Sequence, residues 1–279
     1  MTVTGAAAGV PYLAVPPIHE RPDAPLVLVW HLLDAPRTEA AMAAALPLAD
    51  LDAWRVYLGL PLCGTRSPEG GPEALFALAE QDIVRNVHRP VALGALEEFP
   101  AAYAALREQL GVGSGPVALV GGSLGAAVAQ LVLLEAMPAM GVEVAAAVLL
   151  SPVTQIRAVL DAVGREFGVD YPWDGDTPEF AGRLDFVARA AEFARAGRTP
   201  IRLIVGSEDD VDGFLAPAER LRDALETRYR EPTLLDLVTV AGMAHGLADE
   251  PGMEPAPQTE TAKAADALAV AWLARFVEG

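Results

Sequence analysis

Short apolar runs alternate along the chain with longer segments that repeat apolar positions at helical spacing. The apolar runs predict strands at 9–15, 25–30, 54–60, 116–121, 144–150, 200–206 and 234–242. Most of them lack internal polar positions, which is typical of strands buried on both faces of a parallel sheet. Helical patterns lie between them, at 39–46, 97–111, 124–137, 216–229 and 261–279. This alternation predicts an α/β fold, with a mainly parallel sheet of about seven or eight strands and helices on both faces.

The interval between the strands expected at 144–150 and 200–206 is longer than one crossover helix requires. Residues 155–199 contain two helical patterns around a polar, aromatic turn, YPWDGDTPEF. We interpret 155–199 as a small helical cap inserted into a single domain that spans residues 1–279. The alternative interpretation is an elaborated crossover helix that packs on the sheet.

Composition and charge restrict the class of partner. With 38 acidic against 20 basic residues the net charge is −18, and phosphate binding needs clustered cations, so neither nucleic acid nor an anionic membrane surface is an expected partner. The N-terminal segment lacks a basic stretch, and Pro11 interrupts its apolar run, so we expect no signal peptide. Cys63 is the single cysteine and cannot form an intrachain disulfide. A cytoplasmic protein is therefore expected.

The stretch VALVGGSLGAA, at 117–127, carries the strongest local motif. It contains a G-x-S-x-G pattern formed by Gly121, Ser123 and Gly125, between a strand-like run and a helix of small residues. A serine on such a tight turn is pushed out of the backbone as a nucleophile, and the N-terminus of the next helix can stabilise negative charge. The alternative is a structural glycine turn. Dinucleotide-binding and P-loop motifs are excluded because the glycine spacing fails and the only lysine is Lys263.

A serine nucleophile needs a base, and only a loop at the carboxyl end of a strand can reach it. Of the four histidines, His31 and His245 satisfy this condition; His19 lies in the first loop and is expected to be solvated, and His88 has no strand end beside it. Small neighbours give the loop around His245 the freedom to place an imidazole. The acid that orients the base is expected directly after the strand at 200–206, where spacing alone does not choose among Glu208, Asp209, Asp210 and Asp212.

In this order of nucleophile, acid and histidine, the chain resembles the α/β-hydrolases. GSEDD is similar to their G-x-x-D turn, which implies Asp209 as the acid, and GMAHG is similar to their G-x-x-H-G, which implies His245 as the base. LVLVWHLLDAP resembles their oxyanion-loop strand, which implies the backbone N–H groups of Leu33 and Leu124 as the oxyanion hole. Two positions depart from the family: Leu32 replaces the Gly after the histidine, and the loop at 57–71 lacks the usual Asp.

These residues predict a serine hydrolase that cleaves an acyl ester of a small or medium apolar substrate through an acyl-enzyme, with no metal or other cofactor. The expected substrate contacts are Trp30, His31, Leu32, Trp173 and Met243, together with the cap aromatics Phe167, Tyr171 and Phe180. The alternatives on the same triad are a thioesterase, an acyltransferase or a carbon–carbon hydrolase. A non-catalytic binding protein with this fold is the further alternative. The sequence does not indicate the oligomeric state.

Overall fold

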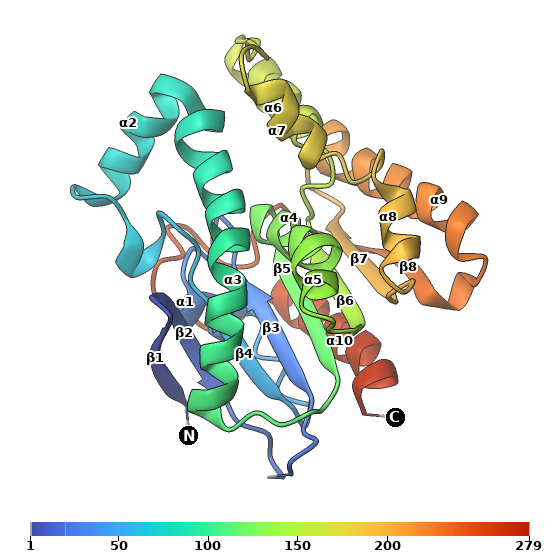
Figure 1. The fold of residues 1–279 in the computed structure, drawn as a ribbon. Helices are drawn as coiled ribbons and strands as arrows, with labels where there is room; N and C mark the ends of the chain where they lie inside the picture. Colours follow the sequence, from blue (N-terminus) through green and yellow to red (C-terminus); the bar gives the residue numbers. More distant parts are fainter. Residues whose placement is uncertain (1, 20, 279) are drawn as a thin grey trace.

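A single sheet organises the chain. The computed structural model describes residues 2–19 and 21–278, without the side chains of Pro72, Glu166 and Phe167, and over these residues the sheet has eight strands (Figure 1). They are β1 (Val3–Ala7), β2 (Val10–Val15), β3 (Leu26–Trp30), β4 (Trp54–Leu58), β5 (Val117–Gly122), β6 (Val144–Leu150), β7 (Ile201–Gly206) and β8 (Leu235–Val240).

The order of strands across the sheet is β1-β2-β4-β3-β5-β6-β7-β8. The pairs β1–β2 and β2–β4 are antiparallel, and every other pair is parallel. The predicted class, a mainly parallel α/β sheet, is therefore confirmed. The sequence analysis placed one strand near the N-terminus, where the structure has the β1–β2 hairpin. It missed β1 because four of its five residues are exposed, so the strand has no apolar face to reveal it.

Helices cover both faces of the sheet (Figure 1). On one face α1 packs on β2 and β4, and α10 packs on β5, β6 and β7; on the other face α3, α4 and α9 cover the strands from β1 to β8. The helices are α1 (Glu39–Ala45), α2 (Gly71–Ile83), α3 (Arg89–Leu110), α4 (Leu124–Leu131), α5 (Met137–Ala139), α6 (Ile156–Phe167), α7 (Thr177–Arg183), α8 (Ala190–Arg195), α9 (Ala216–Tyr229) and α10 (Glu260–Val277).

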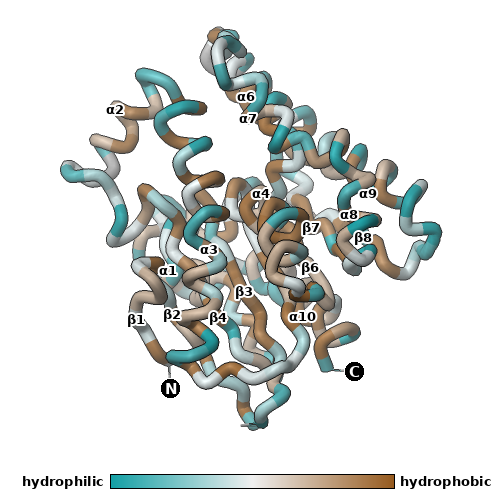
Figure 2. The backbone as a smooth tube through the Cα atoms, viewed as in Figure 1, coloured by the Kyte–Doolittle hydropathy of each residue, from teal (hydrophilic) through white to brown (hydrophobic). Residues whose placement is uncertain are grey.

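Strand β3 illustrates why several strands of this sheet consist of unbroken runs of apolar residues. Its five residues are all buried, but they alternate between two cores. Leu28 and Trp30 belong to the core beneath α3 and α4, whereas Val27 and Val29 belong to the core beneath α1 and α10. Figure 2 shows the apolar residues concentrated in the sheet and the polar residues toward the outer surfaces of the helices. A strand with a core on each side needs apolar side chains at every position.

Two helical projections rise beside the carboxyl ends of the parallel strands (Figure 1). One is α2, which continues through the π-helical segment Val84–His88 into α3. The other projection consists of α6 and α7. Together with α8 these helices make up the 155–199 segment, which therefore has three helices where the sequence predicted two. The sequence analysis did not predict α2. Within the described ranges, no helix is both long enough and apolar enough to cross a membrane.

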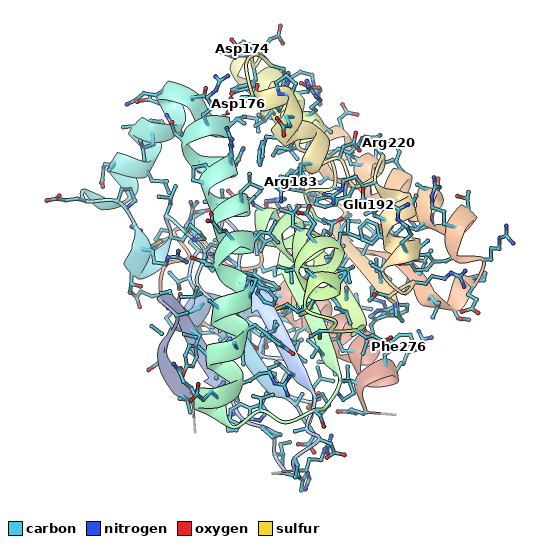
Figure 3. The ribbon with its side chains drawn as sticks, viewed as in Figure 1. Asp174, Asp176, Arg183, Glu192, Arg220 and Phe276 are labelled. Carbon is cyan, nitrogen blue, oxygen red and sulfur yellow. The ribbon has the colours of Figure 1, made fainter. Side chains whose placement is uncertain are left out.

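Polar side chains connect the two projections at their tips. Arg85 lies 2.7 Å from a carboxylate oxygen of Asp174 and 3.0 Å from one of Asp176, and Figure 3 shows both aspartates at the tip of the α6–α7 segment. Beside them, the hydroxyl of Tyr171 donates a hydrogen bond of 2.7 Å to Asp82. The interhelical contact is therefore electrostatic and lies above the carboxyl edge of the sheet.

Candidate active site

Ser123 occupies the tight turn between β5 and α4. Its backbone has φ 50° and ψ −120°, a left-handed conformation that a residue with a side chain rarely adopts. The turn is fixed on both sides, because Ser123 N–H donates to the carbonyl of Leu150 at 2.9 Å and its carbonyl accepts from Val153 N–H at 3.2 Å. The strained turn that the motif predicts is present, and the serine side chain lines the cavity described below.

The flanking glycines are required by close packing. A Cβ atom on Gly121 would lie 2.3 Å from the carbonyl oxygen of Gly125, and one on Gly125 would lie 2.2 Å from the carbonyl oxygen of His31. Neither distance is compatible with a side chain. The glycines thus allow α4 to approach β3 and β5 closely enough for the turn to form.

The structure brings three sequence-predicted residues together. Ser123 Oγ lies 2.8 Å from Nε2 of His245, and Nδ1 of His245 lies 3.1 and 3.2 Å from the carboxylate oxygens of Asp209. Since the carboxylate only accepts, Nδ1 carries the proton and Nε2 accepts from the serine hydroxyl. The ring of Phe214 packs against the imidazole, with 4.1 Å between the ring centroids. This is the geometry that a general base and its orienting acid require.

Asp209 differs from the other three acids of its loop. Its side chain is 1% exposed and contacts His245, and the N–H of Asp210 donates to it at 2.8 Å. The carboxylate of Asp210 instead accepts from Gly213 N–H, and that of Asp212 pairs with Arg165 on α6. Of the four acids that the residue spacing left open, Asp209 is the one whose carboxylate contacts the imidazole of His245 in the described chain.

The acid loop and the histidine loop are directly joined. The N–H of Glu208 donates to the carbonyl of Met243 at 2.9 Å. A Cβ atom on Gly206 would lie 2.0 Å from the same oxygen, so the two loops could not approach in this way with any larger residue. This contact fixes where Asp209 and His245 stand relative to each other.

The two expected oxyanion donors line the same cavity as Ser123. Over the described residues, no backbone hydrogen bond uses the N–H of Leu33 or Leu124. The first N–H groups of a helix have no partner within it, so Leu124 N–H, at the start of α4, is open for a ligand. Leu32, at the family's glycine position, is accommodated because its side chain fills the space beside Gly122, where a Cβ would lie 2.3 Å from Leu32 Cδ1.

A cavity of about 1490 Å³ opens over Ser123 and His245. Two helical walls contribute apolar residues to its lining: Phe76, Ile83 and Val87 come from the α2 side, and Ile156, Val159, Leu160 and Val163 come from α6. Phe76 and Val163 are exposed although they are large and apolar, so both walls present unfilled apolar surface to the cavity. The arrangement can enclose an apolar group next to the serine.

The residues expected to contact substrate lie elsewhere. Trp30, Leu32 and Met243 are packed into the cores of the sheet, and neither they nor Trp173 line the cavity. Trp173 instead packs on Tyr171 and beneath the guanidinium of Arg157, and Phe180 is buried under the same segment. The expectation fails because strand-end side chains of β3 point into the sheet's cores, which hydropathy alone does not reveal. Phe167 lies outside the described side chains.

His31 is also a core residue. Its Nδ1 donates to the carbonyl of Leu32 at 2.6 Å, and its Nε2 accepts from Leu60 N–H at 3.1 Å. Burial lowers the pKa of His31 to about 4, which keeps the ring neutral. His31 therefore connects the loop after β3 to the loop after β4 and does not line the cavity.

The polar residues of the cavity that were not identified as contacts from the sequence include Asp34, Cys63 and His88. Asp34 follows Leu33 directly, so its place after β3 was a usable signal, whereas His88 lies in a helical segment that the sequence analysis did not predict. Burial raises the pKa of the Cys63 thiol to about 12, so this thiol stays protonated and is no competing nucleophile. In the part of the chain that the structure describes, no cluster of His, Cys, Asp or Glu is arranged to hold a metal ion.

Known structures share this architecture. TT1662 from Thermus thermophilus is similar over 100% of this chain and 98% of its own, with 24% identity and a TM-score of 0.69. Carboxyl esterase 2 from Tuber melanosporum covers 99% of this chain and 85% of its own, at 16% identity and a TM-score of 0.56. A dienelactone hydrolase from Anabaena variabilis covers 99% and 97%, at 17% identity and a TM-score of 0.56. No protein-family model and no curated protein sequence matches the chain.

The strand order, the turn at Ser123 and these similarities establish the class: the chain has the α/β-hydrolase fold.

Proposed function

We propose that the protein is a serine hydrolase that cleaves carboxylic esters through an acyl-enzyme. The observation that supports this most strongly is the continuous contact from Ser123 Oγ through His245 to the Asp209 carboxylate. Solved neighbours described as a carboxyl esterase and a dienelactone hydrolase add support for hydrolysis of this bond type.

In the proposed mechanism, Ser123 Oγ attacks the ester carbonyl while His245 Nε2 takes the hydroxyl proton. Asp209 holds the tautomer with the proton on Nδ1 and stabilises the imidazolium. The N–H groups of Leu124 and Leu33 stabilise the oxyanion, and one such donor contributes about 10²–10³ in rate. Nε2 then protonates the leaving alcohol, and water, activated by the same nitrogen, hydrolyses the acyl-enzyme.

The apolar walls of the cavity favour a small or medium apolar acyl group, which would lie against Phe76 on one side and the α6 residues on the other. We also propose that residues 155–199 form a cap, since α6 lines the cavity and the tip of the segment is bridged to Arg85. The proposed enzyme is cytoplasmic and acts on a small molecule without a metal or other cofactor. Its acidic composition disfavours nucleic acid and anionic membranes as partners.

The test is turnover of a panel of p-nitrophenyl esters of increasing acyl length, with Ser123→Ala as the control. We expect hydrolysis by the native enzyme and a loss of about 10⁴-fold or more in the variant. Equal turnover by the two proteins would overturn the proposal. Parallel assays with thioesters distinguish an esterase from a thioesterase on the same triad.

A further inference from the structure

Asp34 places a second carboxylate beside the proposed general base. Its Oδ2 lies 3.5 Å from Nε2 of His245, on the nitrogen that faces Ser123, and its side chain is 52% exposed and lines the cavity. Over the described residues, Asp34 forms no ion pair with an arginine or with Lys263. A carboxylate here is not required by the triad, whose acid is already supplied by Asp209.

The cationic side chains of the cavity are already paired. Arg37 makes two hydrogen bonds, of 3.0 and 2.8 Å, with the carboxylate of Glu250, and Arg165 pairs with Asp212 at 2.9 Å. Glu73 and Glu208 line the same cavity and, within the described chain, form no ion pair. The cavity is therefore negative, and the net charge of −18 extends the same sign over the whole molecule.

This charge opposes the proposed chemistry unless the substrate compensates it. The tetrahedral intermediate carries an oxyanion next to Leu33, the residue that precedes Asp34 in the chain. A nearby carboxylate repels that oxyanion, and the repulsion is strong where water is partly excluded. A positive charge on the substrate offsets this repulsion when it lies between the carboxylate of Asp34 and the reacting ester.

His88 provides an independent sign of a polar ligand in this cavity. It is 9% exposed, it lines the cavity, and its Nδ1 is buried without a hydrogen-bond partner. Buried polar atoms in proteins are usually paired, so Nδ1 of His88 is available to hydrogen-bond a polar group of a ligand that enters this cavity. Burial lowers the pKa of His88 to about 4, so the ring is neutral and does not repel a cation.

We propose that the substrate is an ester whose alcohol part carries a positively charged nitrogen, which pairs with Asp34. This inference rests on the proposed hydrolase function. The alcohol side is assigned because the leaving oxygen takes its proton from Nε2, the atom beside which Asp34 lies. In that step the bond between the acyl carbon and the alcohol oxygen breaks, and the proton on Nε2 passes to that oxygen. The leaving group is an alcohol with a neutral hydroxyl and the positively charged nitrogen.

The test compares two esters that differ only in charge: butyrylcholine and 3,3-dimethylbutyl butyrate, its uncharged carbon isostere. We expect the native enzyme to show a ratio of kcat/KM for the cationic over the neutral ester of roughly tenfold or more. Asp34→Asn should lower this ratio toward one, because the substituted amide is neutral. The control Glu231→Gln removes an exposed carboxylate outside the cavity and should leave the ratio as in the native enzyme.

Equal kcat/KM for the two esters, or a preference that persists in Asp34→Asn, would overturn the inference. So would hydrolysis of p-nitrophenyl esters without turnover of butyrylcholine. Failure of the proposed hydrolase function gives a different result. In that case Ser123→Ala hydrolyses every ester as fast as the native enzyme, whatever the ratio of kcat/KM between the cationic and the neutral ester.

Discussion

Ser123 Oγ lies 2.8 Å from Nε2 of His245, although the two residues are 122 positions apart in the chain. The contact forms because β5 and β8 are parallel members of one sheet, so the loops at their carboxyl ends meet at the same edge. Asp209, after β7, completes the group from a third loop at that edge.

The identity of the acid is testable. Replacing Asp209 by Asn keeps the shape but favours the tautomer with the proton on Nε2, so we expect kcat to fall by about 10⁴-fold. Asp212→Asn is the matched control, because Asp212 is exposed and pairs with Arg165, and its kcat should stay close to the native value. Steady-state kinetics on one p-nitrophenyl ester decides it: a large loss in Asp212→Asn with a small loss in Asp209→Asn would contradict the assignment.

The close packing of the Ser123 turn predicts a stability effect. In Gly125→Ala the new methyl group meets the His31 carbonyl at 2.2 Å, and such overpacking typically costs about 1–3 kcal/mol. We expect a lower Tm by differential scanning calorimetry. Gly182→Ala on α7 is the control, because its Cβ meets nothing within 4 Å and helix propensity should keep or raise its Tm. Equal effects of the two changes would refute the packing argument.

The buried histidines predict a pH dependence of stability. His31 and His88 have an ordinary pKa of 6.5, and burial lowers each to about 4. Unfolding between these values takes up protons, so their contribution to stability is full above about 6.5 and is lost as the pH falls toward about 4. Thermal melts across this window should show a weaker pH dependence in His88→Leu than in the native protein. His19→Asn, at an exposed position, should behave like the native protein; an identical slope in all three would contradict the prediction.

The bridge between the helical projections predicts that its loss changes the mobility of the 155–199 segment. Removing the guanidinium in Arg85→Ala breaks its contacts with Asp174 and Asp176. Networks of ion pairs hold segments together better than isolated pairs, and Arg85 is the centre of such a network. We therefore expect faster hydrogen exchange in residues 168–183 of the variant, and an altered KM for longer acyl esters. Arg222→Ala, which breaks a pair within α9, is the control. Unchanged hydrogen exchange in Arg85→Ala would mean that the bridge does not hold the 155–199 segment in place.

The core of the fold could be predicted from hydropathy because β3 and its neighbours have a core on each side. β1 could not, since its exposed residues leave no apolar signal. The helix α2 was not predicted either: it faces a cavity and not a packed core, and none of its described side chains is buried.

Dependence on tertiary packing also decides which site residues could be predicted from the sequence. Ser123 and His245 could be expected from small neighbouring residues in loops at strand ends, whereas spacing left four acids open and only the resemblance to the α/β-hydrolases implied Asp209. The substrate contacts could not, because whether a strand-end side chain such as Trp30 points into the core or into the cavity depends on tertiary packing. Asp34 and His88 could not be predicted as cavity residues for the same reason, because only the fold brings Asp34 beside His245 and His88 into the cavity lining.

The central claim, that Ser123 is an activated nucleophile, is tested most directly by a fluorophosphonate probe followed by peptide mass spectrometry. We predict a single covalent adduct on Ser123 in the folded protein, and none after denaturation or in His245→Ala, because the hydroxyl reacts only when the imidazole accepts its proton. An adduct that is absent from Ser123, or that forms equally well in the unfolded chain, would contradict the account.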